Sequence, residues 1–485
     1  MDQSRAPLYE AIRKYIKKDM VPFHMPGHSQ GRGVPLSLKR IFGKDFFDFD
    51  LTEVSGLDYL HHARGVIKEA EALAADLYGV KKTFFLVNGT TAGVHAMILA
   101  TCKEGEKIIV GRNSHRSVIG GIIVSGANPV FVHPEFNEEF GIITNLSPKE
   151  LEKTIKQNRD AKAVLITTPN YYGLQGDLKK LIDITHEYGM YALVDEAHGA
   201  HFPFNSKFPK SAIQYGADMV VQSAHKTLPT LTQTSLLHVI TDRINTDMVE
   251  QVLATIESSS PSYIFMTFLD VVRREMALHG EKLWDRAIDV ANYAREKIKK
   301  LPHYRIVDES IVNGKDIYAF DPIKLTINVE ELGFSGFAFE NFLNKHGVEI
   351  ELSDLQNVLL FVTIGNEFKD VDYLINVLKI AEKRAKSKKE KMPPFPVAGK
   401  QVFSPNDAFN MDYTIENIAK TKGMVSWGIV APYPPGIPIL APGMEITQDA
   451  IDFVLEMYGK GGMIQGALED GDKIYVRVLK GGKHD

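Results

Sequence analysis

The chain has 485 residues, 44% of them hydrophobic and 24% charged, a composition typical of a globular protein too long for a single core. Its formal net charge of −5 excludes the basic surface that binding to nucleic acid or an anionic membrane requires. A single cysteine, Cys102, excludes an internal disulfide, and no stretch approaches the roughly 18 consecutive apolar residues of a membrane span. We therefore expect a cytoplasmic protein whose partners are neither nucleic acid nor membrane.

Residues 1–65 are expected to form an N-terminal segment. It begins with an amphipathic helix over 7–18, with Pro7 in the first turn and apolar side chains along one stripe. Two turn-rich motifs follow, HMPGH at 24–28 and DLTEVSGLD at 50–58. The histidines of the first motif could equally be turn residues whose rings bond to the backbone.

Residues 66–300 alternate between helical and strand patterns and are predicted to form the large domain. Its strands are continuous apolar runs, which predict a mostly parallel sheet with helices on both faces, an α/β fold. Ligands of such sheets bind at the carboxyl edge of the strands. Helices are expected at 66–78, 91–101, 115–125, 147–158, 177–189 and within 245–300, and strands at 83–87, 107–110, 129–132, 163–167, 191–194, 218–222 and 235–240.

Two smaller parts are predicted after the large domain. Residues 301–390 fit a small α/β domain with strands near 324–328 and 358–362. The prolines of MPPFP at 392–396 predict a linker, because clustered prolines neither continue a helix nor pair in a central strand. Residues 397–485 would then form a C-terminal α+β domain.

The chemistry-bearing residues follow the apolar runs of the large domain. Asp195 ends one run and Lys226 follows the next, so both are expected at the carboxyl edge of the sheet. The first strand leads into Asn88-Gly89-Thr90-Thr91, where a glycine, two hydroxyls and a helix N-terminus could hold a phosphate. The Gly-x-Gly-x-x-Gly pattern of a dinucleotide site does not follow that strand. Taken singly, each residue also fits a structural role, such as a helix cap or a solvent-facing lysine.

Four motifs together resemble one enzyme family. NGTTAG at 88–93, DEAHGAH at 195–201, SAHKTLP at 223–229 and HMPGH at 24–28 are similar to the ornithine/lysine/arginine decarboxylases, fold type I enzymes that use pyridoxal 5'-phosphate (PLP). The resemblance implies that Lys226 forms a Schiff base with PLP and that Asp195 holds the pyridine nitrogen. It further implies cofactor contacts from Gly89, Thr90, Thr91, Ser223 and His225 at the phosphate, and from His115, Ala197 and His198 at the ring. Glu53 and Glu445 are candidate substrate residues, and no metal ligands are assigned.

The sequence departs from the family pattern in three places. Ser29 and Gln30 follow the second histidine where the family commonly has lysine, Tyr172 stands where it usually has aspartate, and Met444 separates Glu445 from its glycine. These departures put in doubt the substrate contacts that would be carried over. The run ESSSPSY at 257–263 resembles a segment that reaches a neighbouring subunit's site, although a polar loop between helices explains it equally well.

The activity implied is decarboxylation of a basic amino acid, with His225 or Lys226 returning a proton to Cα. The domain plan resembles the short biosynthetic arginine decarboxylases, which favours arginine and polyamine (spermidine) biosynthesis, with lysine and ornithine as alternatives. An aminotransferase or aldolase on the same fold, or a non-catalytic PLP-binding regulator, are the competing classes. The resemblance also implies a homodimer or a higher homo-oligomer, to which residues 1–65 contribute.

Overall fold

The computed structural model describes residues 1–382, 393, 395–433 and 436–483. They form two compact units: Met1–Ala100, Asp195–Ser206 and Lys210–Leu283 in the first, and Thr101–Val194, Lys207–Pro209 and Trp284–Asp485 in the second. The four-part division predicted above stays a prediction. Of the expected linker at 392–396, residues 392 and 394 lie outside the described residues.

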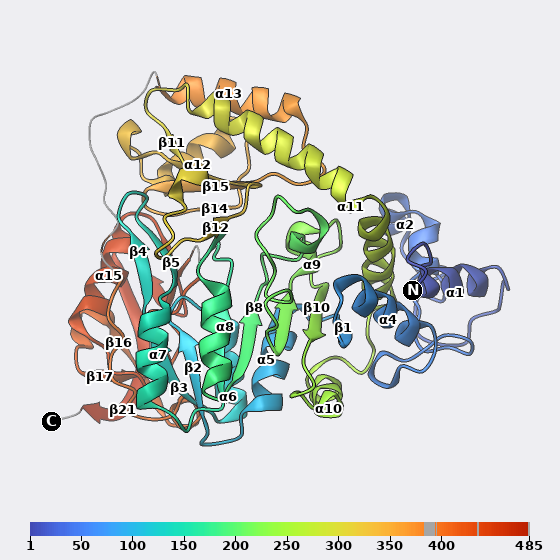
Figure 1. The fold of residues 1–485 in the computed structure, drawn as a ribbon, viewed down its shortest axis with the longest axis horizontal. Helices are drawn as coiled ribbons and strands as arrows, with labels where there is room; N and C mark the ends of the chain where they lie inside the picture. Colours follow the sequence, from blue (N-terminus) through green and yellow to red (C-terminus); the bar gives the residue numbers. More distant parts are fainter. Residues whose placement is uncertain (383–392, 394, 434–435, 484–485) are drawn as a thin grey trace. The chain divides into compact units, whose positions relative to one another are not determined.

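The helices and strands alternate along the first half of the chain (Figure 1). The helices are α1 Pro7–Ile16, α2 Leu36–Phe42, α3 Lys44–Asp48, α4 Val66–Tyr78, α5 Gly89–Thr101, α6 Arg116–Ser125, α7 Pro148–Gln157, α8 Leu178–Glu187, α9 Ala224–Thr227, α10 Thr246–Ile256, α11 Tyr263–Ile298, α12 Gly336–Lys345, α13 Phe368–Glu382, α14 Pro405–Phe409 and α15 Gln448–Gly459. The strands are β1 Lys82–Leu86, β2 Lys107–Gly111, β3 Asn128–Val132, β4 Pro134–Asn137, β5 Ile142–Leu146, β6 Ala163–Thr167, β7 Leu174–Gln175, β8 Tyr191–Asp195, β9 Met219–Gln222, β10 Ser235–Val239, β11 Arg305–Ile306, β12 Ala319–Phe320, β13 Lys324–Asn328, β14 Leu352–Ser353, β15 Asn357–Phe361, β16 Tyr413–Asn417, β17 Met424–Ser426, β18 Ala431–Tyr433, β19 Met463–Gln465, β20 Leu468–Asp470 and β21 Lys473–Lys483.

The strands of the largest sheet follow the order β1-β10-β9 in the first unit and β8-β6-β2-β3 in the second. In the first unit, β10 runs antiparallel to both β1 and β9, with Leu86 opposite Ser235 and Leu236 opposite Gln222. In the second unit, β2 is parallel to β3 and to β6. The buried strand residues are nearly all apolar, as expected of a sheet covered on both faces. The predicted α/β class with a mostly parallel sheet is confirmed, and β10 is the strand that runs against its neighbours.

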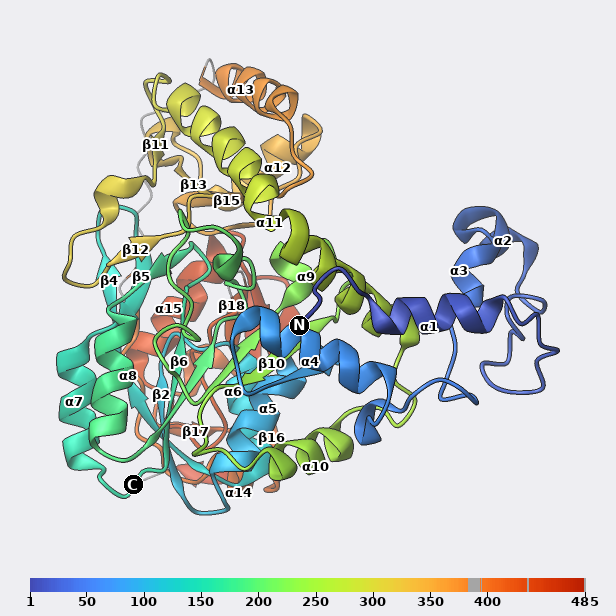
Figure 2. The same cartoon turned by 45° about the vertical axis from the view of Figure 1, so that its right-hand side comes forward.

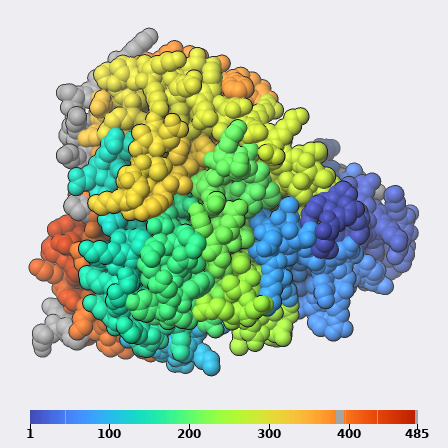
Figure 3. Space-filling view, viewed as in Figure 1, coloured from blue at the N-terminus to red at the C-terminus, as the bar shows by residue number. Residues whose placement is uncertain are grey.

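Local signals set the ends of several helices. Helix α4 ends at Gly79, whose positive φ of 67° forms a left-handed cap, and α8 begins where the Asp177 side chain accepts a hydrogen bond from the backbone N–H of Lys180. Helices α7 and α8 lie side by side in the second unit (Figures 1 and 2). In the space-filling view, the dark-blue N-terminal residues lie beside the lighter-blue surface that follows them in the chain (Figure 3).

Among the described residues, the second unit also contains two four-stranded sheets. Strands β11, β13, β15 and β14 form an antiparallel sheet that carries the strands predicted near 324–328 and 358–362. Strand β21 pairs with β16, β17 and β20 near the C-terminus, where apolar residues of α15 help to form a separate core cluster. The hairpin of β4 and β5 was not predicted from the sequence. Over the residues that the structure describes, no helix is long and apolar enough to cross a membrane.

Candidate active site

The predicted lysine and aspartate come from adjacent strand ends of the first unit. Strand β8 ends at Asp195, and the next residue, Glu196, donates its backbone N–H to the carbonyl of Val221 in β9 at 2.9 Å. This bond aligns the carboxyl ends of β8 and β9, because parallel strands finish at the same edge. The turn after β9 is the short helix α9, which carries Lys226.

Lys226 lies in a polar, partly buried environment. Its Nζ atom is 3.1 Å from Nε2 of His198, and His198 itself is buried. An ammonium group can only donate, so a protonated Lys226 requires His198 Nε2 to accept the bond. The pair can therefore hold one proton between an amine and an imidazole, which is what a lysine needs if its free amine is to act as a nucleophile.

Asp195 is a buried carboxylate close to a cation. Its side chain is 3% exposed, and its Oδ1 atom accepts the backbone N–H of Ala197 at 3.2 Å. Burial raises the pKa of Asp195 above its ordinary value, while the charge of Lys226 acts in the opposite direction. A buried carboxylate favours a cationic partner, because an unpaired charge is costly in such a site. Asp195 thus suits the protonated nitrogen of a pyridine ring.

Three hydroxyl groups meet beside the start of α5. The Oγ1 atom of Thr90 contacts the Oγ atoms of both Ser223 and Ser235, the latter at 2.9 Å. Gly89 adopts a left-handed φ of 71° and donates its N–H to the carbonyl of Gln233 at 2.8 Å, which places the turn at the helix N-terminus. Hydroxyl donors and a helix N-terminus are a donor set that fits a phosphate. Thr91 lies exposed at the same turn.

His225 and Thr227 flank Lys226 on α9. His225 Nδ1 lies 2.8 Å from the carbonyl oxygen of Thr234. Because a carbonyl only accepts, Nδ1 carries the proton, and Nε2 is the ring atom that can exchange one. The hydroxyl of Thr227 is buried and has no hydrogen-bond partner among the described residues. A bound group could satisfy it, so the residues present fit PLP.

His115 acts as a helix cap in the second unit. It precedes α6, and its Nδ1 atom accepts the backbone N–H of Ser117 at 3.2 Å and lies 2.9 Å from that residue's hydroxyl. This local role was one of the alternatives left open by the sequence. Stacking of His115 on a cofactor ring stays a prediction.

The N-terminal histidines bond within their own segment. His24 Nε2 lies 3.1 Å from the Tyr15 hydroxyl, and His28 Nε2 lies 3.1 Å from a carboxylate oxygen of Asp50. Glu53 is exposed and lines an open pocket together with Tyr15 and His24. Each ring also bonds to nearby backbone: His24 Nδ1 lies 2.6 Å from the carbonyl oxygen of the next residue, and His28 Nδ1 accepts the N–H three residues later at 3.0 Å. These backbone bonds agree with the interpretation of the histidines as turn residues, and a substrate role for Glu53 stays a prediction.

The second candidate substrate residue, Glu445, lies half-buried in the second unit. Its backbone N–H donates to the carbonyl of Lys400 at 2.9 Å. The departure at Tyr172 has a structural explanation in the same unit: this buried side chain donates its hydroxyl to Asp354 at 2.5 Å. Tyr172 therefore serves packing and hydrogen bonding where the family usually has an acid.

The sequence did not single out two polar contributors to the site. Ser235 reaches Thr90 because β10 is antiparallel to β9 and begins at the edge where β9 ends. The direction of a strand cannot be read from an apolar run of sequence, so this contact was not predicted. Glu196 is fully buried and accepts bonds from Ser211 Oγ at 2.5 Å and Gln222 Nε2 at 2.7 Å. Burial raises the pKa of Glu196 to about 7. Its position directly after Asp195 was the available signal.

Comparison with known proteins identifies the family. Residues 6–370 match the family model described as Orn/Lys/Arg decarboxylase, major domain. The chain is 34% identical to an arginine decarboxylase of Bacillus subtilis, with 99% of each chain covered, and 35% identical to one of Halalkalibacterium halodurans, with 99% and 98% covered. It is 24% identical to the constitutive lysine decarboxylase of Escherichia coli, covering 99% of this chain and 82% of that one.

Solved structures show the same fold. The lysine decarboxylase of Francisella novicida superposes with a TM-score of 0.84 at 21% identity, covering 98% of this chain and 81% of that one. Lysine decarboxylase A of Pseudomonas aeruginosa gives a TM-score of 0.86 at 21% identity, with 98% and 80% covered. The family-model match and the relatives at 34–35% identity over nearly the whole chain show that the chain belongs to the Orn/Lys/Arg decarboxylase family of PLP-dependent enzymes.

Proposed function

We propose that the chain decarboxylates L-arginine at Cα and releases agmatine and CO₂. The choice of arginine as the substrate is supported by the full-length match to proteins named arginine decarboxylase. For the Bacillus subtilis protein, this match covers 99% of both chains. The Escherichia coli lysine decarboxylase is longer and less similar, at 24% identity. We further propose a cytoplasmic homodimer acting in polyamine biosynthesis.

The residues at the strand ends would divide the work of holding PLP. Lys226 would hold it covalently through its amine, Asp195 would hold the ring nitrogen, and the hydroxyls of Thr90 and Ser223 would hold the phosphate. When bound, PLP supplies a sink for the electron pair that the departing carboxylate leaves behind. The proximity of His198 Nε2 to Lys226 Nζ, at 3.1 Å, supports a proton exchange that frees the amine for reaction with substrate.

Decarboxylation also needs an acid that returns a proton to Cα. His225 and Lys226 are the candidates, because both stand on α9 and both can carry a proton at neutral pH. The bond from His225 Nδ1 to the carbonyl of Thr234 holds the ring in one orientation and leaves proton exchange to Nε2.

The test is turnover of arginine, lysine and ornithine, each offered alone to the purified protein with PLP. We expect CO₂ and agmatine from arginine, and little amine from the other two substrates. Cadaverine from lysine or putrescine from ornithine as the main product would overturn the proposal that arginine is the substrate. A keto acid product would indicate an aminotransferase. The Lys226→Ala variant separates catalysis from a regulatory role, since a regulator would keep its biological effect without this amine.

A further inference from the structure

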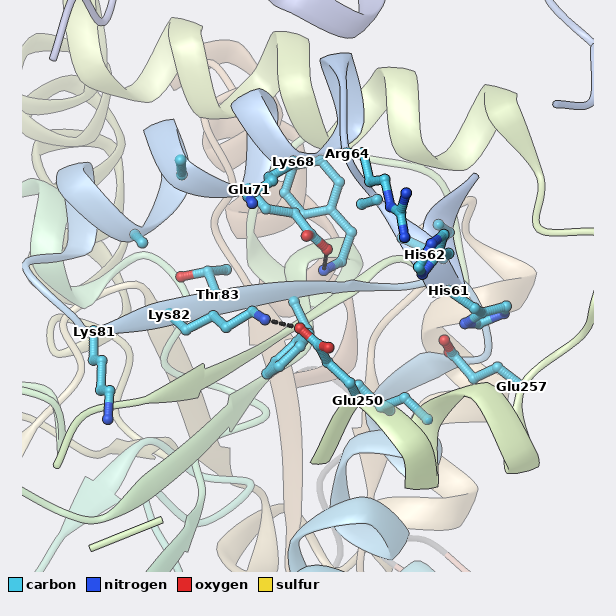
Figure 4. A pocket seen from close by; sticks show the side chains of 17 residues that line it. His61, His62, Arg64, Lys68, Glu71, Lys81, Lys82, Thr83, Glu250 and Glu257 are labelled. Atoms are coloured by element: carbon cyan, nitrogen blue, oxygen red, sulfur yellow. Dashed lines mark hydrogen bonds and ion pairs between the residues drawn. The ribbon is translucent and has the colours of Figure 1, made fainter. Parts of the chain in front are cut away.

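Among the described residues, strand β1 is an edge strand, and carboxylates accept backbone N–H groups in the strand and directly after it. It pairs with β10 on one side and ends the sheet on the other. An edge strand presents unpaired N–H groups at alternate residues. Here Glu71 accepts the N–H of Phe85 at 2.9 Å, and Glu257 accepts that of Val87 at 3.1 Å. Figure 4 shows Glu71 on α4 beside β1, and Glu257 at the end of α10.

Glu257 makes a second bond that Glu71 does not. The same oxygen, Oε1, also accepts the N–H of Asn88 at 3.1 Å. Asn88 directly precedes Gly89, whose own N–H is held by the carbonyl of Gln233. The turn that leads to the Thr90 hydroxyl is thus fixed by a carboxylate on one side and a carbonyl on the other.

Burial makes Glu257 an unusual choice for a loop residue. Its side chain is 7% exposed, and burial raises its pKa to about 7, while the two backbone bonds act in the opposite direction. A carboxylate is costly to bury unless its oxygens accept hydrogen bonds, and such charge-assisted bonds are the strong ones. The Glu257 side chain therefore stays buried because its oxygen accepts both backbone N–H groups, and these bonds hold the backbone in place.

We propose that Glu257 is a positioning residue for the cofactor phosphate, acting by fixing the backbone of Val87 and Asn88 before the Gly89-Thr90 turn. The inference rests on the proposed assignment of that turn and Ser223 to the phosphate. Glu257 would not touch the cofactor. Its removal would let the turn move, so that the hydroxyl of Thr90 and the helix N-terminus no longer meet the phosphate together.

Two neighbouring acids provide matched controls. Glu71 accepts the backbone N–H of Phe85 in β1, which is farther from the turn than Val87 and Asn88. Loss of the Glu71 carboxylate should therefore affect folding more than cofactor binding. Glu250 lines the same pocket, of about 500 Å³, and pairs with the ammonium of Lys82. Its loss should change neither property.

The experiment compares Glu257→Leu, Glu257→Gln, Glu71→Leu and Glu250→Leu in full-length protein, by PLP titration of the apoenzyme, the ³¹P chemical shift of bound PLP, and the melting temperature. We expect Glu257→Leu to weaken PLP binding roughly tenfold or more and to shift the ³¹P resonance, because the N–H groups of Val87 and Asn88 lose their acceptor. Glu257→Gln keeps an acceptor oxygen and should restore most of the affinity. Glu71→Leu should lower the melting temperature and leave the ³¹P resonance in place.

A purely structural role would give a different result. In that case, the loss of PLP affinity in Glu257→Leu and in Glu71→Leu would follow the decrease in melting temperature of each variant, and the ³¹P resonance would not shift. That result would overturn the proposal. Should Glu257→Leu not fold, Glu257→Asp replaces it: the shorter carboxylate cannot reach both N–H groups, so wild-type affinity in this variant would also overturn the proposal.

A Thr90→Val arm separates this inference from the cofactor assignment. If Thr90→Val leaves PLP affinity and the ³¹P shift unchanged, the phosphate assignment fails and the inference fails with it. If Thr90→Val weakens binding while Glu257→Leu does not, only the positioning role of Glu257 is overturned.

Discussion

Gly93 provides a sharp test of how closely α5 fits the sheet. A Cβ atom at this position would lie 2.4 Å from Val221 Cγ2 and 2.8 Å from Leu86 Cδ1, both fully buried in strands, whereas ordinary contact begins near 3.4 Å. Since these side chains cannot move into solvent, Gly93→Ala must push α5 outward by up to about 1 Å, at a cost of about 1–3 kcal/mol for overpacking.

The displacement should appear mainly in cofactor binding, because the N-terminus of α5 is the proposed phosphate site. In the apoenzyme the helix can relax, whereas bound PLP requires its first turn in place. If the whole cost of about 1–3 kcal/mol appears in binding, PLP affinity falls roughly 5- to 150-fold. The assay is PLP titration of the apoenzyme, followed by the absorbance of the bound cofactor.

Gly459→Ala is the matched control, since this glycine ends α15 and an added Cβ would meet nothing within 4 Å. It should leave PLP affinity unchanged and stability equal or slightly higher, because alanine is favoured over glycine in helices. Wild-type affinity and melting temperature in Gly93→Ala would refute the close fit of α5 to the sheet.

Three further predictions concern stability. Arg112 is buried and donates hydrogen bonds to two backbone carbonyl oxygens. Arg112→Leu should therefore lower the free energy of unfolding by roughly 2–6 kcal/mol, at about 1–3 kcal/mol for each acceptor left unsatisfied. The control Arg116→Leu, at an exposed position, should leave the melting temperature unchanged. Tyr172→Phe removes the donor to buried Asp354 and should destabilise the chain by about 1–3 kcal/mol in urea unfolding; an unshifted transition would contradict the importance of this bond. Burial raises the pKa of Glu196 from its ordinary 4.5 to about 7, so its contribution to stability is complete below pH 4.5 and is lost as the pH rises through 7. Glu196→Gln should flatten this part of the curve of melting temperature against pH, and an unaltered curve would show that Glu196 does not titrate there.

Sequence reasoning placed Lys226 and Asp195 at the carboxyl edge of the sheet because the relevant signals are local. An apolar run followed by a polar residue identifies a strand end, and parallel strands bring such ends together. The positions of these two residues follow from that pattern, whereas their proposed roles rest on the family resemblance. The ends of most helices and strands in residues 66–240 agree with the prediction within two residues.

What the sequence could not supply is tertiary. Whether His115 caps a helix or stacks on a cofactor ring depends on the groups that surround its side chain in the folded protein. The bond from Glu257 to Val87 joins residues 170 positions apart, and that of Tyr172 joins residues 182 positions apart. Neither the periodicity nor the spacing of residues in the sequence identifies such partners. The antiparallel direction of β10 cannot be read from its apolar sequence either.

The antiparallel return of β10 has a consequence for the reactive amine. Residues 223–234 connect two strands that are hydrogen-bonded to each other, and the backbone of His225 is itself bonded to Thr234 at 3.3 Å. Such a short, doubly anchored connection has little room to swing as a lid would. If Lys226 holds the cofactor as proposed, its amine would change partners by rotation about its own side-chain bonds, because the backbone that carries it is anchored at both ends.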